Sequence, residues 1–103
     1  MERIKYVAVQ SAVIKIDNSV DTERVYNISG NASINAEGNL ISIDMGVVEK
    51  DGTQVAGFNR WSDTNMGITY QNVEDAEKAT ILLAVTDFIN AAKTYVDEHG
   101  INI

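Results

Sequence analysis

The hydrophobic pattern of the chain changes its period once, and this change constrains the fold more than any other feature. Up to residue 61, apolar residues recur at nearly every second position, which is typical of β-strands. From residue 73 they recur at the spacing of an α-helix. Because 103 residues suffice for one hydrophobic core, we predict a single α+β domain over residues 1–103, with the strands first and a helix last.

Four strands are expected, each ended by a turn of polar residues or glycine. Their approximate ranges are 3–16, 24–34, 40–48 and 54–61. The segment "KDGT", residues 50–53, contains the Asp-Gly pair that suits the type I′ turn between neighbouring antiparallel strands. We therefore predict a four-stranded antiparallel sheet, in which the last three strands form a meander and the long N-terminal strand is added to it.

One long C-terminal helix is expected to pack on this sheet. Residues 62–71 are predicted as an irregular loop, in which residues 68–70 can form a short extended piece. Residues 73–99 are predicted as the helix, with Asn72 as its N-cap. Within the helix, twelve of the eighteen residues 79–96 are apolar. A helix that packs on one sheet needs an apolar stripe of only about 100°. Three residues broaden the stripe beyond that width: Leu82, Ile89 and Val96.

This broad stripe leaves three explanations open. The sheet can curl around the helix, part of the helix can contact a second copy of the chain or another protein, or the stripe can line a groove for an apolar ligand. Trp61 and Arg60, at the end of the fourth strand, are further interface candidates, because Trp and Arg are common anchors of protein interfaces. The edges of a four-stranded sheet offer a second surface for association. We predict self-association through the helix, a sheet edge or both.

Residue types exclude several kinds of chemistry. The chain has no cysteine and a single histidine, His99, so thiolate sites, multi-histidine zinc sites and cysteine nucleophiles are absent from it. The acidic residues of the segment "DNSVDTE", 17–23, lack the glycine and glutamate that a calcium-binding loop places after them. No base lies near the serine of "RWSD", residues 60–63, to activate it. We expect no catalytic residues, no cofactor and no metal.

The charge of the chain argues against nucleic-acid partners. Fifteen acidic residues against eight basic ones give a net charge of −7. Nucleic-acid binding depends on Lys and Arg, and the sequence offers no basic stripe. Neither a signal peptide nor an apolar run of membrane-spanning length is apparent. We therefore expect no membrane partner, and a location in the cytoplasm or in a virion.

Two functional interpretations follow. The first is a small, non-enzymatic structural or interaction subunit that associates with itself, for which a virion or phage particle is one setting. The alternative is a module that binds a small ligand in a pocket between the helix and the sheet. In that case Trp61, Met66 and Tyr70 would line the mouth of the pocket, because such pockets combine apolar walls with a few polar groups.

Overall fold

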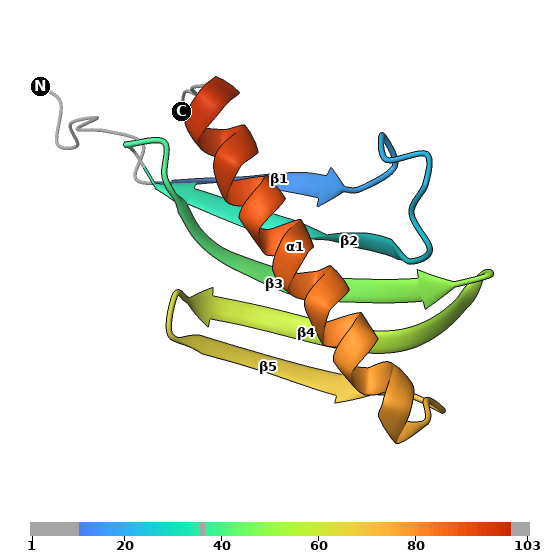
Figure 1. Cartoon of the computed structure of the whole chain (residues 1–103). Coiled ribbons are helices and arrows are strands. Elements are labelled where there is room, and N and C mark those ends of the chain that lie inside the picture. Colours follow the sequence, from blue (N-terminus) through green and yellow to red (C-terminus); the bar gives the residue numbers. More distant parts are fainter. Residues whose placement is uncertain (1–10, 36, 100–103) are drawn as a thin grey trace, which may run out of the picture.

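The computed structural model, which describes residues 11–35 and 37–99, contains one antiparallel sheet with a helix lying across one of its faces (Figure 1). The strands follow one another in the sheet in the order of the sequence. The elements are β1 (Ser11–Asp17), β2 (Asn27–Asn35), β3 (Leu40–Lys50), β4 (Thr53–Ser62), β5 (Asn65–Tyr70) and α1 (Asp75–His99). The predicted α+β class is confirmed, but the predicted number of four strands is wrong, because the sheet has five. Residues 3–10 of the expected first strand lie outside the described residues.

The fifth strand lies in the range that was predicted as a loop. After a tight turn at Asp63 and Thr64, β5 runs back antiparallel to β4, with Met66 opposite Arg60 and Tyr70 opposite Ala56. The apolar residues of β5 alternate with polar residues and glycine, as they do in the earlier strands. The antiparallel meander therefore continues through this range.

The hairpin between β3 and β4 has the predicted turn. Lys50 pairs with Thr53, and the two residues between them have positive φ angles, 52° at Asp51 and 81° at Gly52. A type I′ turn requires positive φ at both central positions, and its twist matches that of the flanking strands. The Asp-Gly signal of the sequence is thus confirmed.

A β-bulge interrupts the pairing of β3 with β4. Asp44 and Met45 on β3 lie opposite a single residue, Asn59, on β4. Met45 takes the left-handed conformation, with φ at 52°, and its backbone N–H donates to Oδ1 of Asn59 at 3.2 Å. Beyond the bulge, Gly46 lies directly against the ring of Phe58, where a Cβ atom would be 2.5–2.6 Å from ring carbons. Only glycine fits this position.

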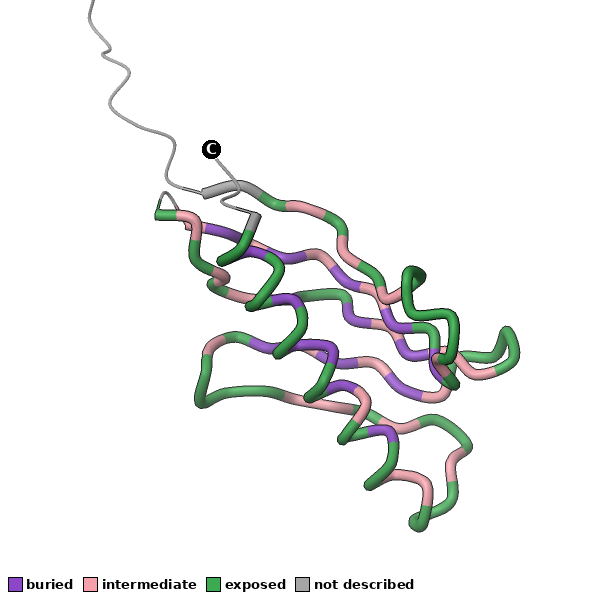
Figure 2. The backbone as a smooth tube through the Cα atoms, turned by 45° about the horizontal axis from the view of Figure 1, so that its top comes forward, coloured by how far each residue is buried: buried purple, intermediate pink, exposed green. Residues whose placement is uncertain are grey.

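The hydrophobic core lies between α1 and one face of the sheet. The burial pattern alternates along the strands and follows one stripe of the helix (Figure 2). Phe58 and Phe88 meet edge to face in this core, with their ring centroids 6.4 Å apart. The buried helix residues are Ile81, Val85, Phe88, Ile89, Ala92 and Val96. Within the described ranges no segment covers the other face of the sheet, where β2 presents polar side chains such as Asn31.

The helix begins later than the sequence predicted. The ladder between β4 and β5 continues to Gln71, whose N–H donates to the carbonyl of Val55 at 2.9 Å. Asn72 then takes a left-handed conformation, with φ at 54°, and turns the chain toward the helix. Asn72 is therefore a turn residue and not the N-cap, and α1 starts at Asp75.

Candidate functional site

The two edge strands of the sheet are β1 and β5 (Figure 1), and they differ in their charge. β1 carries the exposed charged residues Lys15 and Asp17. Charged side chains on an edge strand discourage pairing with a strand of another chain. β5, with the sequence "NMGITY", has neither a charged residue nor a proline. Of the two edges in the described part of the sheet, β5 is the one that lacks these protective features.

The hydrogen-bonding groups at the open side of β5 can be assigned from its pairing with β4. In an antiparallel ladder, only every second residue of a strand bonds to a given neighbour. Gln71 bonds to β4 through Val55, so Thr69 and Gly67, at alternate positions, direct their backbone groups toward β4 as well. The N–H and C=O groups of the alternate residues therefore point away from the sheet: Met66, Ile68 and Tyr70.

These three residues also place their side chains on the face of the sheet that carries the helix. Ile68 is opposite the buried Phe58 in the register and packs against the core. Ile68 and Tyr70 are half-buried, and Met66 is 37% exposed. The open edge thus combines backbone N–H and C=O groups that point away from the sheet with a row of partly exposed apolar side chains.

One residue of α1 extends this row. Lys78 lies over the ring of Tyr70, with its Nζ 5.8 Å from the ring centroid, and Thr86 lines the same surface hollow as Met66. Leu82 follows Lys78 by one helical turn and precedes Thr86 by one, so it lies between the contact of Lys78 with Tyr70 and the hollow that Thr86 and Met66 line. Its side chain is 40% exposed. We call the surface formed by the uncharged residues Met66, Ile68, Tyr70 and Leu82, which adjoins Lys78, the β5 strip.

The predicted interface residues do not all lie at the surface. Leu82 and Trp61 are exposed, whereas Ile89 (8% exposed) and Val96 (1%) are buried by the chain's own sheet. Arg60 is also buried, at 5%. Sequence reasoning did not select Ile68, although its alternation with Met66 and Tyr70 carried a strand signal.

Arg60 and Asp63 anchor the β4–β5 turn. Nη1 of Arg60 donates to the carbonyl of Ile41 at 3.0 Å, and Nη2 forms an ion pair with Asp63. Nζ of Lys93, on α1, lies 3.4 Å from the same carboxylate. The hollow beside them measures about 250 Å³ and is also lined by Met66. Since the buried guanidinium is bonded within the chain, we assign it a role in holding the turn against the helix.

The ligand-pocket candidates lie on opposite faces of the sheet. The ring of Trp61 covers Gly67, where a Cβ atom would be 3.1 Å from the indole, and Gly67 faces away from the helix. Met66 and Tyr70 lie on the helix side, because Met66 lines the same hollow as Thr86 and Tyr70 lies under Nζ of Lys78. The structure therefore does not bring Trp61, Met66 and Tyr70 together at one pocket mouth.

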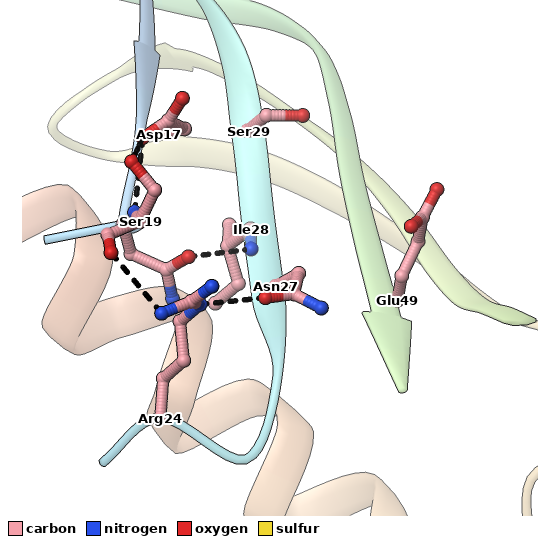
Figure 3. A pocket seen from close by; sticks show the side chains of 8 residues that line it. Asp17, Ser19, Arg24, Asn27, Ile28, Ser29 and Glu49 are labelled. Atoms are coloured by element: carbon pink, nitrogen blue, oxygen red, sulfur yellow. Dashed lines mark hydrogen bonds between the residues drawn. The ribbon is translucent and has the colours of Figure 1, made fainter. Parts of the chain in front are cut away.

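A second hollow, of about 170 Å³, lies at the connection between β1 and β2 (Figure 3). Oδ1 of Asp17 accepts hydrogen bonds from the hydroxyl and the amide of Ser19, at 2.6 and 2.9 Å, and these bonds lower the pKa of Asp17. Arg24 donates to Oδ1 of Asn27 at 2.6 Å. These groups satisfy one another and stabilise the connection. Among residues 11–35 and 37–99, no three His, Asp or Glu side chains are grouped closely enough to hold a metal ion.

A small polar cluster fastens the first turn of the helix to the sheet. The hydroxyl of Tyr26 donates to Oε2 of Glu77 at 3.2 Å, and Nζ of Lys50 lies 3.4 Å from the same oxygen. Burial raises the pKa of Tyr26, and the negative charge of Glu77 raises it further. The cluster ties Tyr26, which directly precedes β2, and Lys50 of β3 to the first turn of α1, so we assign it a structural role.

In the described part of the chain, no helix has both the length and the apolar character required to cross a membrane.

Comparison with known proteins adds no information about function. No family model, no curated protein and no solved structure matches the chain.

Proposed function

We propose that the chain is a non-enzymatic structural or interaction subunit that associates with itself through the edge of its sheet and the adjoining side of α1. The observation that carries this proposal is the β5 strip, an uncharged edge strand flanked by the exposed Leu82. Open edges of this kind are templates for pairing with another chain. A virion or phage particle is one setting in which such a subunit would assemble.

The burial of the helix supports an interface beside α1 and not along its whole apolar stripe. The chain's own sheet covers the stripe from Ile81 to Val96, so little of it remains for a partner. Leu82 and Leu83 are the exposed leucines of the helix. Because successive helix residues are about 100° apart, Leu82 faces the β5 edge while Leu83 faces outward.

These two leucines provide a matched pair of variants. Leu82→Glu places a carboxylate in the β5 strip, and we expect it to weaken self-association at least tenfold. Leu83→Glu adds the same charge on the outward face of the helix, and we expect a change of less than threefold. The measurement is the dissociation constant from sedimentation equilibrium, with circular dichroism to verify that both variants are folded. Equal weakening by the two variants, or stronger weakening by Leu83→Glu, would contradict an interface at β5.

The salt dependence of self-association tests whether the two copies are held together despite their like charge or by attraction between opposite charges. Each copy carries a net charge of −7, so two copies repel each other, and the four residues of the β5 strip, unlike the adjoining Lys78, carry no charge. Added salt screens this repulsion, because the Debye length falls from about 10 Å at 0.1 M to about 3 Å at 1 M. We expect the dissociation constant to fall roughly threefold or more over that range. Weaker association at high salt would indicate attraction between opposite charges and would contradict the proposal.

A further inference from the structure

We infer that two copies of the chain pair antiparallel through β5, with Ile68 of one copy opposite Ile68 of the other, so that the two sheets join into one. This inference rests on the proposed self-association and specifies its geometry. It follows from the residues of β5 that direct their backbone groups away from the sheet, namely Met66, Ile68 and Tyr70.

The alternation of hydrogen-bonding residues along a strand restricts the register between two β5 strands. Only residues that direct N–H and C=O toward the partner can form hydrogen-bonded pairs. Of the symmetric registers, the one centred on Ile68 lets all three open-edge residues bond to one another. Ile68 then exchanges both bonds with its counterpart, and Met66 exchanges both bonds with Tyr70 of the other copy. A register centred on Gly67 or Thr69 leaves one of the three without a partner among them.

The side chains favour the same register. Residues directly opposite each other in an antiparallel pair lie on the same face of the sheet. Ile68 therefore meets Ile68 and Met66 meets Tyr70, all on the helix side, where these side chains are partly exposed. No like charges are opposed within β5, because the strand has none. Apolar and aromatic cross-strand pairs of this kind stabilise sheets.

The size and charge of the surface favour a second copy over a different large partner. A six-residue edge with one flanking leucine belongs with the small interfaces that form reversibly. A basic partner would seek the acidic surface of the chain, whereas the residues of the β5 strip have no charge to attract it and the adjoining Lys78 would repel it. A second copy provides an edge strand of the same length that also has no charged residue. The pairing is accordingly a reversible dimer contact.

Disulfide trapping tests the register directly, because the chain has no cysteine of its own. In the proposed pairing the two Cα atoms of residue 68 are about 5.5 Å apart, within the roughly 4.4–6.8 Å that a disulfide spans. We expect Ile68→Cys to form a covalent dimer under mild oxidation. Thr69→Cys is the matched control, because its two Cα atoms would be diagonal neighbours about 7–8 Å apart. It should remain monomeric on a non-reducing gel.

A second pair of variants covers the case in which Ile68→Cys perturbs folding. Met66→Cys and Tyr70→Cys should each fail to cross-link alone, but a mixture of the two should form a heterodimer, because residue 66 faces residue 70 of the other copy. Cross-linking of Thr69→Cys in preference to Ile68→Cys would overturn the register. A noncovalent dimer in which none of these cysteines cross-links would overturn pairing through β5, while self-association itself would stand.

Residues 1–10 of another copy are the competing occupant of the β5 edge. Their sequence, "MERIKYVAVQ", is rich in β-branched residues and could also add a strand. Val7→Pro would remove a backbone donor from such a strand, so we expect it to leave both the dimer and the Ile68→Cys cross-link unchanged. Loss of the dimer in Val7→Pro, together with no Ile68→Cys cross-link in the otherwise wild-type chain, would assign the edge to that segment and overturn the inference. A chain that is monomeric at every concentration would instead refute the proposed function.

Discussion

Gly46→Ala is expected to destabilise the fold by about 3 kcal/mol, because overpacking of a rigid core site is costly. The new Cβ would lie 2.5–2.6 Å from three atoms of the Phe58 ring. That ring is 2% exposed and packs edge to face on Phe88, so it has little room to move away. The measurement is the midpoint of urea denaturation, compared with that of the wild-type chain.

Gly57→Ala is the matched control for this prediction. Gly57 lies on β4 next to Phe58, but a Cβ there meets its nearest neighbours at 3.5 and 3.6 Å, which is ordinary contact. We expect a change within about 0.5 kcal/mol for this variant. Equal destabilisation by the two variants would show that the cost at Gly46 arises from a general requirement for glycine in these strands. A neutral Gly46→Ala would contradict the close packing of β3 on Phe58.

Arg60→Ala is expected to have the second large effect, a loss of about 2–3 kcal/mol, since hydrogen bonds to charged groups contribute more than neutral ones. Arg60 is 5% exposed and connects three segments, through the carbonyl of Ile41, the carboxylate of Asp63 and its packing beneath α1. Its removal also takes away the buried aliphatic part of the side chain. Thermal or urea unfolding measures the loss.

Lys93→Ala separates the buried arginine from the exposed ion pair that shares its acceptor. The side chain of Lys93 is 46% exposed, and that of Asp63 is 75% exposed. Exposed pairs of this kind contribute about 0–1 kcal/mol, so we expect Lys93→Ala to be nearly neutral. If Lys93→Ala were as damaging as Arg60→Ala, the anchoring of the β4–β5 turn would depend on the ion pair with the helix and not on the buried guanidinium.

Local signals in the sequence predicted the local structure well. The alternation along residues 27–35 and the Asp51-Gly52 turn depend on neighbouring residues alone, and both appear in the structure. The helix was also evident, because its apolar period extends over many turns. Its start was misplaced because Gln71 remains in the ladder through its bond to Val55, a contact distant in sequence.

The candidate site was harder to predict because it depends on long-range pairing. The sequence predicted at most a short extended piece at residues 68–70 of this range, whereas β5 begins at Asn65 and its Gly67 accommodates the ring of Trp61 on the outer face. Which apolar residues of the helix remain exposed depends on where the sheet covers it. Ile89 and Val96 are buried by that sheet, while Leu82 is left exposed beside β5. Helical spacing alone could not separate these three residues.

Absolute mass in solution, measured by light scattering on a sizing column over a dilution series, tests the central claim most directly. Self-association predicts that the mass rises with concentration from 11.3 kDa toward twice that value. It also predicts that Leu82→Glu holds the mass at 11.3 kDa over the same series. A wild-type chain that stays at the monomer mass at the highest concentration would contradict self-association through β5.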